Sequence, residues 1–205
     1  GYYKTYIVYK ERWNICLYFP WNRSCNRNIN LIPTRKESDE VLYTKESIIK
    51  ITAQDLVELK QMARLNPRQR IRICSHFNIN DTVHEMIIYH PKGTYVPPHK
   101  HLGKDESFHL ISGEIDCVIF NNQGDVIKVF PMGDYSSGKT FYYRIPADTF
   151  HTQIFKKDTF FHEVAEGPFN REDTIIANWA PDEKETAMVK KYIAKISKNL
   201  ESINS

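Results

Sequence analysis

Three histidines and a glutamate have the residue types and spacing of a metal site. His99 and His101 are separated by one residue, Glu106 follows five residues later, and His151 lies further along the chain. In a strand, alternate side chains point to the same face, so the imidazoles of His99 and His101 would project together. A glycine-containing turn can then return the chain and bring the Glu106 carboxylate to the same point. His151, which follows a proline turn, would complete the site from another strand.

The donor set itself indicates which chemistry is possible. Three imidazoles and one carboxylate suit a borderline divalent ion such as Fe(II), Zn(II), Mn(II), Ni(II) or Co(II), whereas Ca(II) and Mg(II) prefer oxygen ligands. Four protein ligands leave one or two positions open if the metal is five- or six-coordinate. An open position distinguishes a catalytic site from a closed structural site. The pattern therefore predicts one divalent transition metal and leaves its identity open.

Short strands must position these residues. Seven of the eight glycines fall between Gly93 and Gly167, and the same region holds most of the alternating β-branched and aromatic runs. Short strands with Gly, Pro and Asn-Asp turns are typical of a sandwich or barrel. The predicted strands are residues 83–89, a single run from 108 through Gly113 to 120, and residues 126–130, 140–145, 149–155, 160–164 and 174–177. Residues 121–125 read as a hairpin turn.

Helices are predicted at the two ends of this strand region. Thr52 can cap a helix over residues 53–65, which Pro67 would end, and Asp182 can cap a helix over residues 183–200. Residues 1–47 are rich in Tyr, Trp, Asn and Arg and show no sustained period. They are expected to form an edge strand, with residues 6–9 and 15–18 as candidates, or an oligomer arm.

The segment from Gly93 to Gly113 resembles the first motif of the cupin superfamily. It contains a glycine, five residues, the pair His99 and His101 in HxH spacing, four residues, Glu106, six residues and a second glycine. Residues 146–155 resemble the shorter second motif, although Asp148 stands where Gly is usual and Phe155 where Asn is common. The resemblance implies a mostly β fold, the double-stranded β-helix or jelly-roll barrel. It also implies that His99, His101, Glu106 and His151 hold the metal inside the barrel mouth.

A narrower resemblance covers residues 51–181. The motifs at 66–70, 74–76, 163–168 and 179–181 look like those of the WbuC-type cupin metalloproteins. Members of that family tend to lie among genes for surface polysaccharide (O-antigen) synthesis. The resemblance implies a metal-dependent enzyme acting on a sugar or nucleotide-sugar intermediate. The expected organisation is an N-terminal extension over 1–47, a cupin domain with its leading helix over 48–181, and a C-terminal helix over 182–205.

Several residues outside the ligand set are candidates for substrate binding. Arg68, Arg70 and Arg72 alternate, so on an extended segment they would share one face. Guanidinium groups bind phosphate and carboxylate in a bidentate manner, which makes Arg68 and Arg70 candidates for gripping an anion. The competing interpretation is a solvated face or a set of interface salt bridges. Tyr143, predicted to point into the barrel, is a candidate cavity residue.

A reaction would also need a general base. The carboxylate ligand is committed to the metal, so the base must come from another residue, and His76 and Glu163 are the two candidates. An isomerase or epimerase fits these residues, and an Fe(II) dioxygenase fits the same four ligands. A protein of a different class, a non-catalytic metal-dependent sugar-binding or regulatory protein, is a further alternative. A polar cavity around the metal would favour an enzyme, whereas a dry apolar mouth would favour binding.

Composition narrows the possible partners and the location. The chain has 28 Lys and Arg against 25 Asp and Glu, a formal charge of +3, which gives no reason to expect nucleic acid. No apolar stretch approaches the length of a membrane span, and residues 1–20 lack the pattern of a signal peptide. The four cysteines form no CxxC pair and are expected to be reduced. We therefore expect a cytoplasmic protein that binds a small-molecule substrate and neither nucleic acid nor membrane. Cupin barrels often pair through an edge strand, so the resemblance implies a homodimer.

Overall fold

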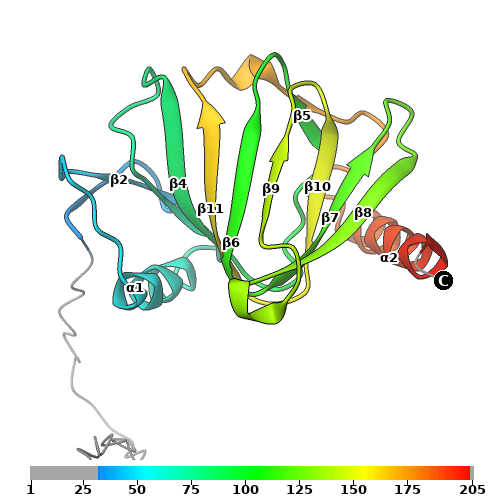
Figure 1. Cartoon of the computed structure of the whole chain (residues 1–205), viewed down its shortest axis with the longest axis horizontal. Helices are drawn as coiled ribbons and strands as arrows, with labels where there is room; N and C mark the ends of the chain where they lie inside the picture. Colours follow the sequence, from blue (N-terminus) through cyan, green and yellow to red (C-terminus); the bar gives the residue numbers. More distant parts are fainter. Residues whose placement is uncertain (1–31, 204–205) are drawn as a thin grey trace, which may run out of the picture.

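Two β-sheets carry most of the chain that the computed structural model describes, which is residues 32–203 (Figure 1). The larger sheet runs in the order β1 (Thr34–Lys36), β2 (Val41–Thr44), β3 (Ile71–Cys74), β4 (Val83–His90), β11 (Thr159–Glu166), β6 (Glu106–Ser112) and β9 (Tyr142–Ile145). The smaller sheet runs in the order β12 (Thr174–Ile176), β5 (His99–His101), β10 (Phe150–Phe155), β7 (Glu114–Phe120) and β8 (Val126–Gly133).

The order of eight central strands is that of a jelly roll. One half of the barrel is β4-β11-β6-β9 and the other half is β5-β10-β7-β8, with antiparallel pairing throughout both halves. Along the chain the strands pass back and forth between the two sheets, which is the wrapped Greek-key arrangement of this architecture. The predicted fold, a mostly β jelly-roll barrel with flanking helices, is therefore confirmed.

One predicted strand is wrong, because residues 108–120 form two strands. β6 ends at Ser112 and β7 begins at Glu114, and the two belong to different sheets. Gly113 lies between them with φ +110°, and a Cβ added there would lie 2.6 Å from the backbone oxygen of Asp158. This left-handed backbone and close approach both require glycine, so the chain changes sheets at this residue.

Helix α1 (Ala53–Ala63) begins as predicted. The Thr52 side chain accepts a hydrogen bond from the Asp55 backbone N–H, and the Asp55 carboxylate accepts one from the Thr52 backbone N–H, which together form a capping box. Leu59 and Ala63 are buried against residues of β3 and β4, including Ile71 and Tyr89. The helix thus covers the outer face of the larger sheet near its β3–β4 side.

Helix α2 (Thr186–Ile203) starts three residues later than predicted. Asp182 accepts a hydrogen bond from the backbone N–H of Lys184 and so closes a turn ahead of the helix instead of capping it. Ile196 is buried with Val118 and Phe120, which places the helix against the smaller sheet beside β7 and β8 (Figure 1). Within residues 32–203, no helix combines the length and the hydrophobicity that a bilayer span needs.

The described part of the N-terminal extension adds two strands to the larger sheet. β1 pairs with β2, and β2 pairs in parallel with β3 at the edge of the barrel. The strand candidates at residues 6–9 and 15–18 lie outside the described residues. Cys74 and Cys117 are buried free thiols.

The barrel interior has a dry part built from aromatic and aliphatic side chains. Phe108 is fully buried, and its ring stacks against Tyr143 at 5.1 Å and against Phe161 at 4.2 Å between centroids. Leu110, Ile115 and further apolar residues of both sheets complete this cluster. It closes one end of the barrel interior, and the polar residues of the predicted site occupy the positions next to it on the same strands.

Candidate metal centre and adjoining cavity

The structure brings the four predicted ligands together. His99 and His101 lie on β5, Glu106 begins β6, and His151 lies on β10 directly opposite His99. Their donor atoms all lie within 4.8 Å of one another. One oxygen of Glu106, Oε2, is 3.0 Å from Nε2 of His101, and the other, Oε1, is 3.5 Å from Nε2 of His151. Three strands from two sheets therefore converge on one small volume.

Backbone carbonyls determine which ring nitrogens face that volume. Nδ1 of His99 is 2.9 Å from the carbonyl oxygen of Pro97, and Nδ1 of His151 is 2.9 Å from that of Thr149. A carbonyl only accepts, so each Nδ1 carries the hydrogen and donates it. The lone pair of each Nε2 is then directed at the cluster. Hydrogen bonds of this kind orient histidines that bind metals.

The Nε2 lone pairs and the carboxylate have unsatisfied acceptor capacity. Nε2 of His151 is fully buried and makes no hydrogen bond within the described residues, since its nearest carboxylate oxygen is 3.5 Å away. Nitrogen lone pairs and carboxylate oxygens directed at one point need a cation or a proton between them. These residues therefore fit a bound metal ion, and the donor types fit a divalent transition metal.

The charge states in the cluster favour the same interpretation. Burial, together with the neighbouring His151, lowers the pKa of His99 to about 4, so this imidazole is neutral. Burial alone would raise the pKa of Glu106, but the adjacent His151 and the hydrogen bond from His101 lower it below its ordinary range. Burial would likewise lower the pKa of His151, and the Glu106 carboxylate reverses this and raises it. A proton that the metal-free pair shares would be released when a cation binds.

Two buried side chains support Glu106 from the barrel core. The Tyr143 hydroxyl donates to Oε1 of Glu106 at 3.3 Å, and the Gln153 amide donates to the Tyr143 oxygen at 2.7 Å. Tyr143 points inward as predicted, but it is not among the residues that line the adjoining cavities, so it lies in position to hold the carboxylate and not a substrate. Gln153 is not among the residues predicted from the sequence, although it stands two residues after His151 and is the only other strongly polar residue at an inward position of β10.

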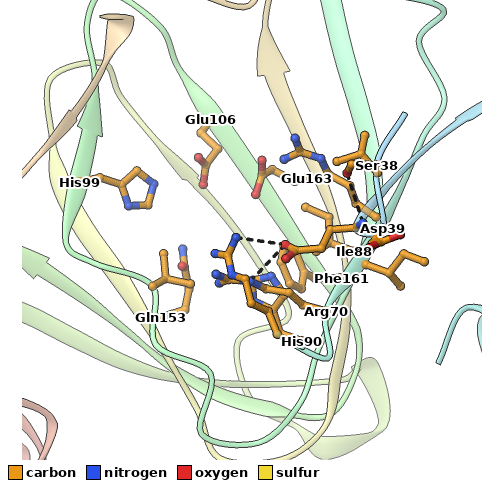
Figure 2. Close-up of a pocket in the computed structure, with 16 residues that line it drawn as sticks. Ser38, Asp39, Arg70, Ile88, His90, His99, Glu106, Gln153, Phe161 and Glu163 are labelled. Carbon is orange, nitrogen blue, oxygen red and sulfur yellow. Dashed lines mark hydrogen bonds and ion pairs between the residues drawn. The ribbon is translucent and has the colours of Figure 1, made fainter. Parts of the chain in front are cut away.

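A cavity of 620 Å³ connects the cluster to three arginines (Figure 2). His99 and Glu106 line one part of it, and Arg68, Arg70 and Arg72 line another. A neighbouring cavity of 530 Å³ shares these residues and also reaches His101 and His76. The walls are thus polar and charged, with apolar side chains such as Val96 and Phe161 between the polar groups.

Of the two predicted general bases, Glu163 lines both cavities, whereas His76 lines only the second, and His99 and Glu106 line both as well. Glu163 sits on β11 directly opposite Phe108 of β6, so its side chain points into the barrel (Figure 2). Burial, followed by the charge of Glu106, raises the pKa of Glu163 to about 8. This carboxyl group can therefore hold or release a proton near neutral pH.

His76 is placed differently. It is buried on the wall of the second cavity, where its ring stacks on His84 at 4.0 Å and meets the edge of Tyr43 at 5.4 Å. Its Nδ1 lies 3.2 Å from backbone atoms of Glu85, and burial lowers its pKa. Among the described residues, no hydrogen bond or ion pair joins His76 to the four-residue cluster. This position fits packing better than proton transfer.

Arg68, Arg70 and Arg72 lie together, but they do not share one face of an extended segment as predicted. Gln69 has φ +52°, so Arg68 and Arg70 lie on a turn and not on an extended segment. Both guanidinium groups bind Glu183, at 3.0 Å and 2.5 Å respectively. Arg72 lies on β3 opposite Ile88 and lines the same cavity. The turn therefore places two positive groups beside a third that comes from the sheet.

One family model matches part of the chain. The model of a domain of unknown function (DUF6016) matches residues 51–132, a span that includes His99, His101 and Glu106 but not His151. A search of curated proteins finds no match.

The solved structures that match this chain are only distantly similar to it. The formate complex of oxalate decarboxylase from Lactobacillus farciminis matches 48% of this chain and 27% of its own, at 20% identity and a TM-score of 0.38. A protein from Shewanella oneidensis matches 58% and 75%, at 14% identity and a TM-score of 0.42. A sugar phosphate isomerase of the cupin superfamily from Silicibacter pomeroyi matches 42% and 52%, at 18% identity and a TM-score of 0.34. The chain thus spans 27% of the length of the oxalate decarboxylase, and the fold assignment rests on its own strand order.

Proposed function

We propose that the protein is a mononuclear metal-dependent enzyme of the cupin type that acts on an oxygen-rich small molecule such as a sugar derivative. The observation that carries the proposal is the set of Nδ1 hydrogen bonds that turns the Nε2 lone pairs of His99 and His151 toward the Glu106 carboxylate. A divalent ion held there by His99, His101, Glu106 and His151 would act as a Lewis acid on a carbonyl or hydroxyl oxygen of the substrate.

The cavity supports catalysis over simple binding. Its polar groups include Gln153, Glu163 and Arg72, none of which is needed to complete the four-ligand set. Glu163 can take a proton from a carbon next to a substrate carbonyl and return it at the same or a neighbouring carbon. This is the proton movement that an isomerase or epimerase requires, and it leaves the composition of the substrate unchanged. The sequence resemblance adds a setting, the synthesis of surface polysaccharide from sugar or nucleotide-sugar intermediates.

Exchange of substrate hydrogen with solvent tests this role of Glu163. The metal-loaded protein is incubated in D₂O with a panel of sugar phosphates and nucleotide sugars, and deuterium incorporation at carbon is followed by NMR. We expect incorporation into at least one compound, slowed about 100-fold or more in Glu163→Gln with little change in KM.

The matched control is Glu85→Gln, which changes an exposed carboxylate on the neighbouring strand β4. It should exchange like the unmodified protein. Equal rates in Glu163→Gln and the unmodified protein would exclude Glu163 as the base. Lack of exchange with every compound would argue against proton-transfer chemistry on sugars.

A further inference from the structure

Two carboxylates hold the Arg68 and Arg70 pair, and they do so unequally. Glu183 uses both oxygens, with Oε2 at 3.0 Å from Arg68 and Oε1 at 2.5 Å from Arg70. Glu40 uses the single oxygen Oε2, at 3.2 Å from Arg68 and 3.5 Å from Nε of Arg70. The short paired contacts belong to Glu183, and the long shared contacts belong to Glu40. Of the two, Glu40 is therefore the more weakly bound.

The two carboxylates also differ in their relation to the cavity. Glu40 lines it, together with Ser38 and Asp39 of the turn between β1 and β2, whereas Glu183 is not among the lining residues. Glu183 thus holds the guanidinium groups from outside the cavity, and Glu40 covers them from within it. The turn that carries Glu40, residues 37–40, joins the two edge strands of the larger sheet, and none of its residues pairs in the sheet.

The surroundings of these arginines favour an anion. The Arg70 side chain is only 10% exposed, so its charge lies largely out of water and needs a negative partner. Arg72 lines the same cavity and adds a third positive charge to those of Arg68 and Arg70. The acidic residues that line it are Asp39, Glu40, Glu106 and Glu163. A phosphate dianion would match this charge better than the one carboxylate oxygen that Glu40 supplies, and guanidinium groups bind phosphate oxygens in pairs.

We propose that Arg68 and Arg70 form a binding site for a phosphate group of the substrate, which the Glu40 carboxylate occupies until the phosphate displaces it. Glu183 orients the two guanidinium groups and is not displaced. The site lies in the cavity that His99 and Glu106 also line, so a phosphate ester held here extends toward the metal centre. The inference rests on the proposed function only in assigning the phosphate to the substrate of that centre.

Phosphate binding to chelator-treated protein tests the site independently of any metal. Inorganic phosphate is titrated at low ionic strength and its binding is followed by ³¹P NMR, with acetate as a second ligand. If Glu40 fills the site about nine-tenths of the time, Glu40→Gln should bind phosphate about tenfold more tightly than the unmodified protein. Arg68→Gln and Arg70→Gln should lose most of this binding, and acetate should bind more weakly than phosphate.

The charge control is Glu58→Gln, a half-buried position on α1 whose carboxylate accepts a hydrogen bond from the Gln54 amide. It should leave phosphate affinity unchanged. Arg70 is buried, so Arg68→Gln, at a half-exposed position, provides the same test if Arg70→Gln does not fold. Urea unfolding checks that each variant is native.

Three results would overturn the inference. Equal phosphate affinity in Glu40→Gln and the unmodified protein would show that Glu40 does not occupy the site. Undiminished binding in Arg68→Gln would place the phosphate elsewhere, and tighter binding of acetate would identify a carboxylate site instead. Because the metal is absent from these titrations, they can fail while the proposed metal chemistry stands, and the reverse also holds.

Discussion

The dry end and the polar mouth of the barrel interior are built on the same strands. On β6, inward positions pass from Glu106 to Phe108 within two residues, and on β10 they pass from His151 to Phe155 within four. The strand geometry is the same on both sides of this boundary. Only the side-chain chemistry changes, from imidazole and carboxylate to aromatic rings.

The dry end of the barrel stabilises the fold, whereas the polar mouth holds the candidate metal site. Aromatic and aliphatic side chains at the dry end gain free energy by leaving water. Glu106 and His151 of the mouth are buried, and the free energy of hydration that they lose is offset only by contacts with their partners. Tyr143 joins the two regions, because its ring stacks on Phe108 and its hydroxyl donates to Glu106. A fold that needed only stability would have little reason to bury Glu106 and His151 beside two further, half-buried histidines.

The largest effect should come from the dry end. Phe108→Ala would remove a fully buried ring between Tyr143 and Phe161 and leave a cavity, so the free energy of unfolding should fall by about 3–5 kcal/mol. Urea unfolding measures this. Phe77→Ala, at a half-exposed position, is the control and should cost less than about 1 kcal/mol. Similar losses in both variants would show that Phe108 has no special place in the core.

A smaller effect should appear where the two regions meet. Tyr143→Phe would keep the ring in the core and remove the hydroxyl that holds Glu106, so metal affinity should fall about tenfold with little change in stability. A competitive chelator titration with Zn(II) gives the affinity. Tyr142→Phe removes an exposed hydroxyl on the same strand and should have no effect. A loss of stability without a loss of affinity would assign Tyr143 to the core alone.

The smallest effect should be a pH dependence at the cavity wall. Burial, followed by the charges of Arg68 and Arg72, lowers the pKa of His90 to about 3, while the unfolded value is near 6.5. The unfolded state therefore binds more protons between these values, so His90 stabilises the fold above pH 6.5 and this contribution is lost as the pH falls. Between pH 7 and 5.5 the loss should be about 1 kcal/mol.

The variant His90→Phe tests this pH dependence. Phenylalanine is a suitable replacement because His90 already packs against the rings of Phe155 and Phe161. The unfolding free energy of metal-free protein is measured at both pH values. The unmodified protein should lose about 1 kcal/mol more than the variant over this interval. Parallel pH profiles would contradict the prediction.

Much of the fold could be predicted because its signals are local. Alternating apolar residues and turn residues mark the central strands, and the Thr52 cap marks the start of α1. The spacing of His99, His101 and Glu106, with His151 further on, predicts that these four side chains converge. Each of these patterns spans few residues or repeats at a fixed period.

The remainder depends on contacts that no local pattern records. The change of sheet at Gly113 follows from its closeness to Asp158, which is distant in sequence. Glu40 and Glu183 lie on opposite sides of the arginine turn in the sequence and meet only in the folded chain. Gln153 reaches Glu106 only through Tyr143. Register and tertiary approach determine all of these, and sequence spacing does not.

Metal content tests the central claim most directly. Protein purified without chelator is analysed by plasma mass spectrometry, beside His151→Ala and the control His109→Ala, which alters an exposed histidine of β6. We expect about one equivalent of a divalent transition metal per chain in the unmodified protein and in His109→Ala, and little in His151→Ala. Absence of metal from the unmodified protein after incubation with these ions, or equal metal in all three samples, would contradict the account.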